Sequence, residues 1–116
     1  MFSLALRRSF RNRIREAKSR MNILEIRFKW TKTRKEYEES ARPDRMANLP
    51  GLHWKIYGFD DEGSMATGIY LFGDIESLNS YLGPFMEHAQ PDGVVDLEYK
   101  VWEVQEGLGE ITRAPI

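Results

Sequence analysis

Apolar residues in this chain follow two different spacings, and the order in which the spacings occur predicts the fold. Residues 22–30, NILEIRFKW, alternate between apolar and charged side chains, which is the period-two pattern of a half-buried strand. Three further segments alternate in the same way or are rich in β-branched and aromatic residues, at residues 52–59, 64–72 and 94–104. Turn-forming residues bound these segments, so four strands are expected.

A helix is predicted between the first two strands. It begins after Thr33, because Thr33 and Glu36 three residues later form a capping-box signature. The helical pattern extends to about Asn48. Pro43 either kinks this helix or begins a second short helical piece, since proline has no backbone N–H and is tolerated in a first helical turn.

A second helix is predicted after Asp74, which serves as its N-cap, and residues 83–84, Gly-Pro, are expected to interrupt it. The tail at residues 107–116 is expected to be extended. The resulting order is β-α-β-β-α-β, for which one sheet with both helices on one face is the ferredoxin-like solution of the α+β class. With 116 residues, we expect one such domain over residues 21–116 and a separate extension over residues 1–20.

Composition excludes several kinds of site. The sequence has no cysteine, which excludes disulfides, thiolate catalysis and cysteine-based zinc or iron–sulfur sites. Only two histidines are present, His53 and His88, which argues against a histidine-rich metal site. The glycines of TGIYLFGD, residues 67–74, lack the spacing of a nucleotide-binding loop. We therefore expect neither a metal ion nor a cofactor.

Residues 1–20 carry seven Lys and Arg against one Glu, whereas the rest of the chain is net acidic. Their apolar residues recur at helical spacing, but no apolar run is long enough for a secretory signal or a membrane span. Three interpretations remain open: an extension upstream of a true start at Met21, a mitochondrial transit peptide or, least favoured, a segment that binds a membrane surface or nucleic acid. We expect a cytoplasmic protein with no membrane or nucleic-acid partner, or a mitochondrial one if the segment is a transit peptide.

The alternation also assigns side chains to the two faces of the sheet. The helix-covered face is expected to carry Leu24, Ile26, Phe28, Trp30, Leu52, Trp54, Ile56, Ile69, Leu71, Leu97, Tyr99 and Val101. The opposite face is expected to mix charges with aromatic residues, at Arg27, Lys29, His53, Lys55, Tyr57, Tyr70, Phe72, Asp96, Glu98, Lys100 and Trp102. Clustered exposed aromatic residues mark interfaces, so we expect a homodimer through the face that carries Tyr57, Tyr70 and Trp102.

Four short blocks of sequence occur in a fixed order: Pro50-Gly51-Leu52, Trp54-Lys55-Ile56, Gly68-Ile69-Tyr70-Leu71-Phe72 and Ile111-Thr112-Arg113-Ala114-Pro115. Together these blocks resemble the YdhR-type family of mono-oxygenases, within the dimeric α+β barrel superfamily. The resemblance covers about residues 22–116, and it departs from the family pattern at Thr67, where relatives have a second glycine before the Ile-Tyr block. It implies a cofactor-independent mono-oxygenase that acts on a small aromatic substrate.

Such chemistry needs an aromatic pocket, a base and a hydrogen-bond donor to the developing anion. We expect the pocket between the helices and the sheet, with Trp54, Phe28 and Trp30 as its aromatic wall. His88 is the predicted base at its mouth, because Phe85 lies on the buried stripe one turn earlier, and Tyr81 is the predicted polar partner. Tyr70 is a candidate hydrogen-bond donor, and Lys55 and Arg113 are candidates for binding an anionic substrate.

Each of these residues also has a purely structural interpretation, as a core tryptophan, an interface tyrosine or a solvated histidine. Two further hypotheses therefore remain open beside the enzyme: a non-catalytic homodimeric module that binds a small molecule or responds to stress, and a structural dimer whose core is filled. A cavity with a base in reach favours the enzyme, a cavity without one favours the binding module, and a filled core favours the structural dimer.

Overall fold

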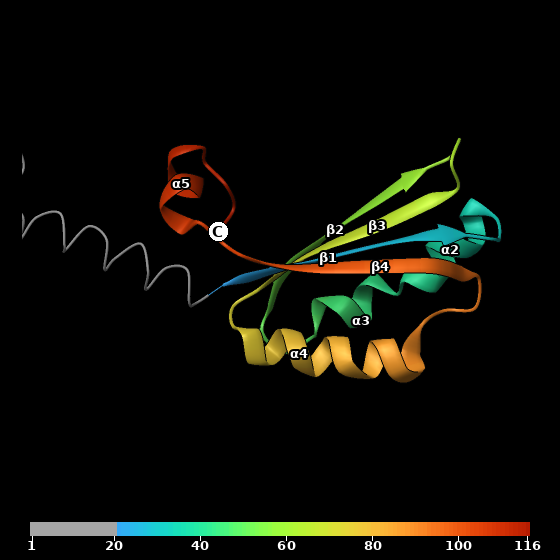
Figure 1. Cartoon of the computed structure of the whole chain (residues 1–116), viewed down its shortest axis with the longest axis horizontal. Coiled ribbons are helices and arrows are strands. Elements are labelled where there is room, and N and C mark those ends of the chain that lie inside the picture. The colour runs from blue at the N-terminus through green and yellow to red at the C-terminus, as the bar shows by residue number, and fades with distance from the viewer. Residues whose placement is uncertain (1–20) are drawn as a thin grey trace, which may run out of the picture.

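The computed structural model describes residues 21–116, and the extension predicted over residues 1–20 lies outside the described residues. Four antiparallel strands form one sheet in the order β2-β3-β1-β4 (Figure 1). The strands are β1 (Asn22–Trp30), β2 (Leu52–Asp60), β3 (Met65–Phe72) and β4 (Val94–Glu103). The helices are α2 (Arg34–Ala41), α3 (Pro43–Ala47), α4 (Ile75–Pro84) and α5 (Glu106–Ile111), and a π-helical turn, η1 (Phe85–Ala89), continues α4.

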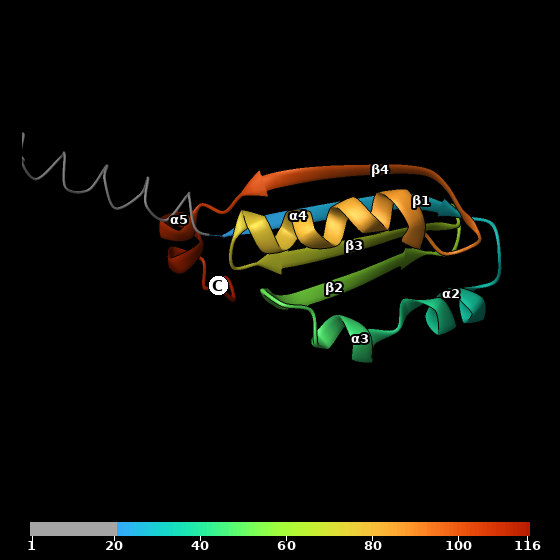
Figure 2. The same ribbon diagram turned by 90° about the horizontal axis from the view of Figure 1, so that it is seen from below.

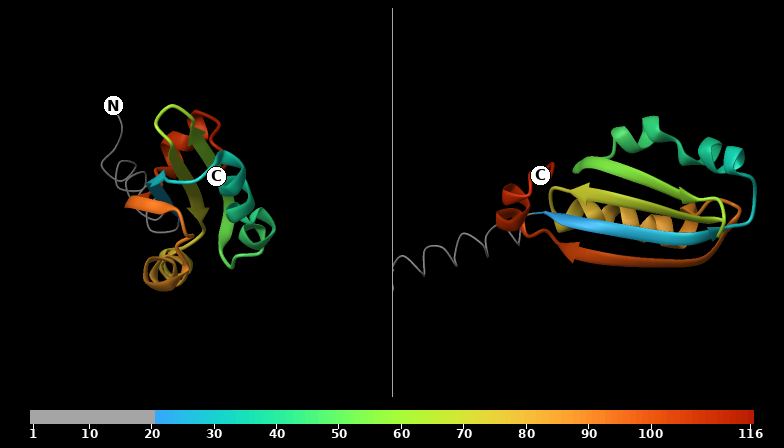
Figure 3. Two further views of the ribbon diagram at one scale, coloured as in Figure 1. Left: turned by 90° about the vertical axis from the view of Figure 1, so that its right-hand side faces the viewer. Right: turned by 90° about the horizontal axis from the view of Figure 1, so that it is seen from above.

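Helix α4 runs beneath the sheet, while α2 and α3 follow its β2 edge (Figure 2). The end-on view in Figure 3 shows α4 and the α2–α3 pair as two separate helical segments beside the sheet. This order and arrangement confirm the predicted ferredoxin-like α+β fold. No helix within residues 21–116 has the length and apolar character needed to cross a lipid bilayer.

The predicted helix after Thr33 exists as two pieces. The capping box is confirmed, since the Thr33 side chain accepts from the Glu36 backbone N–H and the Glu36 side chain accepts in return. Helix α2 ends at Ala41, and its C-cap residue, Arg42, adopts the left-handed backbone conformation with φ 47°. Pro43 then occupies the first turn of α3, which selects the second of the two predicted alternatives.

The second predicted helix begins as expected, with the Asp74 carboxylate accepting from the Ser77 backbone N–H. The predicted interruption at Gly83-Pro84 is wrong, because α4 includes Pro84 and continues through η1. A proline in a helix removes one backbone N–H donor. The π turn that follows has i→i+5 hydrogen bonds in place of i→i+4, so the chain remains helical past the proline. The tail predicted as extended is also different, since its first part folds as α5.

The sheet faces are as predicted for β1 and reversed for much of β2 and β3. Leu24, Ile26 and Trp30 are buried on the helix side, together with Tyr70 and Phe72. The prediction for Tyr70 and Phe72 is wrong because β3 carries apolar residues on both faces, so alternation alone does not say which face is covered. Six further residues exchange the faces assigned to them: Trp54, Lys55, Ile56, Tyr57, Ile69 and Leu71.

A β-bulge explains the reversal in β2. Leu52 pairs with Phe72, and Trp54 already pairs with the next residue of β3, Leu71, so His53 is the extra residue. Leu52 therefore faces the helices as predicted, whereas the residues after the bulge change sides, because a shift of one residue reverses every following side chain.

The main core lies between the sheet and α4, where Leu78, Leu82 and Phe85 pack against β1 and β3. A second cluster surrounds Leu71 on the other face, where Met21 and Val104 cover it.

Candidate functional site

A cavity of about 420 Å³ lies between the helix-covered face of the sheet and the two helical segments. This volume falls within the range of small-molecule sites. The sheet contributes Ile26, Phe28, Lys55, Tyr57, Thr67, Gly68 and Tyr70, the α2–α3 segment contributes Tyr37, Ser40, Ala41, Arg42, Arg45 and Met46, and α4, η1 and the following loop contribute Tyr81, Phe85, Ala89 and Pro91. The lining is largely apolar and aromatic, with a few polar groups that come from opposite walls.

Lys55 is the one side chain on the sheet floor that carries a titratable nitrogen into the cavity. The bulge at His53 turns it to this side, because without the extra residue the strand would present Lys55 to the opposite face. Its Nζ lies 4.2 Å from the ring centroid of Tyr57 and 4.3 Å from that of Tyr70, so two aromatic faces hold the ammonium. Gly68 on β3 leaves room for it, since a Cβ there would lie 3.0 Å from Lys55 Cε.

Burial lowers the pKa of Lys55 to about 8. Within residues 21–116, no carboxylate forms an ion pair with this ammonium and no side-chain oxygen accepts a hydrogen bond from it. A lysine with this pKa is a mixture of amine and ammonium near neutral pH, so Lys55 can both accept and return a proton there.

Four tyrosines surround the cavity beside Lys55. The hydroxyls of Tyr70 and Tyr81 are hydrogen-bonded at 2.9 Å, which joins the sheet to α4. The Tyr57 hydroxyl is buried and has no partner among the described residues. Burial raises the pKa of each of these three phenols and of Tyr37, so all four remain protonated near pH 7. They are therefore hydrogen-bond donors rather than bases.

Four of the candidate site residues named from the sequence are brought together at this cavity: Phe28, Lys55, Tyr70 and Tyr81. The predicted location of the pocket, between helices and sheet, agrees with the structure. The functional roles predicted for these residues stay predictions.

Four predicted site residues lie elsewhere. Trp54 is on the opposite face because of the bulge, where its indole N–H donates to the Pro115 carbonyl at 2.7 Å. Trp30 is buried beside Tyr37 as a core residue, with its indole N–H donating to the Thr33 carbonyl. Neither tryptophan lines the cavity, so the predicted aromatic wall of three residues reduces to Phe28.

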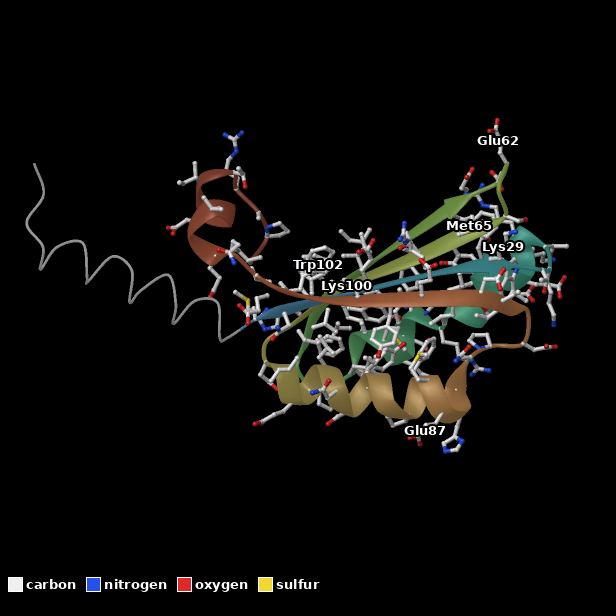
Figure 4. All side chains as sticks on the ribbon, in the orientation of Figure 1. Lys29, Glu62, Met65, Glu87, Lys100 and Trp102 are labelled. Atoms are coloured by element: carbon white, nitrogen blue, oxygen red, sulfur yellow. The ribbon has the colours of Figure 1, made fainter. Side chains whose placement is uncertain are left out.

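His88 and Arg113 are also absent from the lining. The His88 side chain is 80% exposed, and its Nε2 lies 3.5 Å from a carboxylate oxygen of Glu87. Figure 4 shows the Glu87 side chain pointing away from the sheet. The π turn carries His88 outward even though Phe85 faces the core. Arg113 lies in the tail after α5, and His53 is exposed at the bulge. The sequence did not identify Tyr57 and Tyr37 as donors, nor Lys55 as the titrating group. The bulge in β2 turns Tyr57 and Lys55 into the cavity, and alternation gives no sign of it, whereas Tyr37 comes from α2.

The face opposite α4 carries exposed apolar side chains. Ile56 is 53% exposed and Trp102 is 50% exposed, and Figure 4 shows Trp102 on this side of the sheet. The Trp102 indole N–H donates to Glu25, and the Lys100 ammonium lies over the Trp102 ring at 5.4 Å. Trp102 and Lys100 therefore lie on the face predicted for them, opposite the helices, whereas Tyr57 was predicted for the same face and lies in the cavity.

Comparisons with known proteins agree on the fold. The family model described as "Putative mono-oxygenase ydhR" matches residues 23–115. SnoaB, a cofactor-independent oxygenase from Streptomyces nogalater, is 15% identical with a TM-score of 0.60, over 73% of this chain and 93% of that one. A protein from Shewanella oneidensis is 10% identical with a TM-score of 0.55, over 74% of this chain and 92% of that one. No curated protein matches the chain.

Proposed function

Because this chain belongs to the ydhR family of mono-oxygenases, we propose that it oxygenates a small aromatic substrate without a cofactor, in the cavity that holds Lys55. The observation that carries the proposal is a cavity of about 420 Å³ with a titrating amine on its floor and neutral phenols on its walls. The fold similarity to a cofactor-independent oxygenase supports the same reaction class. Fold alone does not establish function, so the site chemistry carries the argument.

Lys55 is the proposed general base. As the free amine, it takes a proton from an acidic ring carbon in the keto tautomer of a phenolic substrate, such as the CH₂ group of anthrone, and leaves a delocalised anion. The substrate itself supplies the electrons to O₂. A carbon–oxygen bond forms, the oxygen–oxygen bond breaks, one oxygen remains as a carbonyl and the other leaves as water, so anthrone and O₂ give anthraquinone and water.

The tyrosines would stabilise the negative charge that develops on the substrate oxygen. The Tyr57 hydroxyl has a proton with no acceptor within residues 21–116, and one of the paired Tyr70 and Tyr81 hydroxyls also retains a free proton. Neutral donors that are held in place before the reaction are effective at this task, because they need no reorganisation as charge appears.

Oxygen uptake with anthrone tests the proposal, after subtraction of the uncatalysed rate. Wild type should consume O₂ and produce anthraquinone in equal amounts. Lys55→Met and Lys55→Arg should both lower kcat by about 10²-fold or more, because methionine has no basic nitrogen and a guanidinium does not give up its proton. Lys35→Met, a lysine on α2 outside the cavity, is the matched control. No uptake by wild type with anthrone or with quinols would instead favour a non-catalytic binding module.

We also propose that two copies of the chain pair through the open face that carries Ile56 and Trp102. The support is the exposure of these two large apolar side chains beside charges of both signs, which a second copy would cover. Light scattering should give twice the monomer mass at micromolar concentration, and Ile56→Glu should shift the equilibrium to monomer. A monomeric wild type would contradict this pairing.

A further inference from the structure

The cavity has an uneven charge. Its lining includes three basic side chains, Arg42, Arg45 and Lys55, and no Asp or Glu. Within residues 21–116, neither arginine forms an ion pair, although the chain contains many carboxylates on its surface. The positive charge is therefore available to a ligand.

Arg42 and Arg45 lie at the mouth of the cavity, because both line it and both are exposed. They come from the junction between α2 and α3, on the wall opposite Tyr81, whereas Lys55 lies on the sheet floor among aromatic rings. A ligand in the cavity would thus lie beside the Lys55 amine on the floor and near the two arginines at the mouth.

The backbone conformation of Arg42 also indicates that this side chain has a role at the cavity. It adopts the left-handed conformation at the C-cap of α2, with φ 47°, a position that favours glycine. An arginine there carries a steric cost that glycine would avoid, and such costs persist where the side chain has a task. The side chain at this position lines the cavity.

We infer that the natural ligand of this cavity is an aromatic molecule with a carboxylate or comparable acid group, bound by Arg42 and Arg45 at the mouth while its ring lies among the tyrosines near Lys55. Planar carboxylates accept paired hydrogen bonds from guanidinium groups, which fixes the orientation of the ring. The inference deepens the proposed function, since it names the substrate class of the same site.

Binding of a matched pair of ligands tests the inference without any need for turnover. Titration calorimetry at low salt should show that 1-hydroxy-2-naphthoate binds at least about tenfold more tightly than 1-hydroxy-2-naphthamide, which has the same shape and no charge. The preference should weaken as salt is added, because both guanidinium groups are exposed.

Three variants show which groups cause the preference. The double variant Arg42→Gln/Arg45→Gln should bring the two dissociation constants within about twofold of each other while the amide binds as before. Arg42→Lys/Arg45→Lys should retain only part of the preference, because an ammonium keeps the charge but not the paired hydrogen bonds. Lys35→Gln, which removes one cation from α2 outside the cavity, should retain all of it.

Equal binding of acid and amide by wild type would overturn the inference even if oxygen uptake occurs. A preference that survives the double glutamine substitution would also overturn it. Conversely, a clear preference for the acid with no oxygen uptake would leave this inference standing and remove the proposed oxygenase activity.

Discussion

Replacement of Lys55 by methionine should stabilise the protein at neutral pH. Methionine keeps the length and packing of the side chain and removes the charge that the cavity desolvates. The folded pKa of Lys55 is about 8 against an ordinary value of 10.5. At about 1.4 kcal/mol for each pKa unit, this difference corresponds to at most roughly 3.5 kcal/mol of destabilisation when the ammonium is held in the fold.

The two tyrosine rings that face the ammonium offset part of this cost, and methionine loses that interaction. Lys55 is only partly buried, so each such contact contributes about 0.5–1 kcal/mol and the two together offset about 1–2 kcal/mol. We therefore expect Lys55→Met to raise the free energy of unfolding by about 1.5–2.5 kcal/mol at pH 7.

The sign of the pH dependence follows from the direction of the pKa difference. Since the folded pKa is lower, the unfolded chain binds more protons at this position between about pH 8 and pH 10.5, and wild type gains stability as pH rises through this window. The advantage of Lys55→Met should therefore be constant below pH 8, shrink above it and disappear near pH 10.5. The tyrosines titrate in both proteins, so their contribution largely cancels in the difference.

Urea denaturation of both proteins at pH 7, 8.5 and 10 measures this difference, with Lys35→Met as the exposed control. A variant that is less stable than wild type at pH 7 would refute the reasoning. A stability difference that stays the same from pH 7 to pH 10 would refute it as well, because Lys55 would then have an ordinary pKa in the folded protein.

Three further outcomes are expected. Gly68→Ala places a Cβ 3.0 Å from Lys55 Cε and 3.1 Å from a Tyr70 ring carbon, so it should lower oxygen uptake while it costs about 1–2 kcal/mol of stability in urea. Tyr81→Phe removes the hydrogen bond to Tyr70 and should cost about 1–2 kcal/mol in the same assay. Hydrogen bonds from Ser77 lower the pKa of Asp74, so its contribution should be lost as pH falls through that lowered value, and Asp74→Asn should flatten the acid limb of the stability curve.

The order of elements and the helix starts follow from local chemistry, so the sequence predicts them well. Thr33 and Asp74 cap helices because their side chains satisfy backbone N–H groups within three residues, whatever the rest of the fold does. The faces of β2 and β3 depend on partners far away in the chain. Trp54 and Tyr70 are large and partly apolar, so either one satisfies the alternation rule for the covered face, and only the pairing register decides between them.

The site was harder to predict than the fold for the same reason. A lysine in an alternating strand is expected to face solvent, since an unpaired buried ammonium costs free energy. Lys55 faces the cavity because an extra residue, His53, precedes it by two positions and because Gly68 across the ladder leaves space for its stem. His88 was the reverse case, since helical spacing from Phe85 assumes an α-helix and the π turn changes the angle between the two residues.

The bulge at His53 also connects the cavity with the open face. By the same shift it turns Lys55 toward the helices and Trp54 away from them, where the indole meets the Pro115 carbonyl of the C-terminal tail. Figure 1 shows this tail and α5 on the side of the sheet opposite α4. With an unshifted strand, the cavity would receive an indole in place of an amine, and the open face would receive a charge in place of an apolar surface. One inserted residue therefore sets both the chemistry available inside the fold and the character of the surface that a second copy would cover.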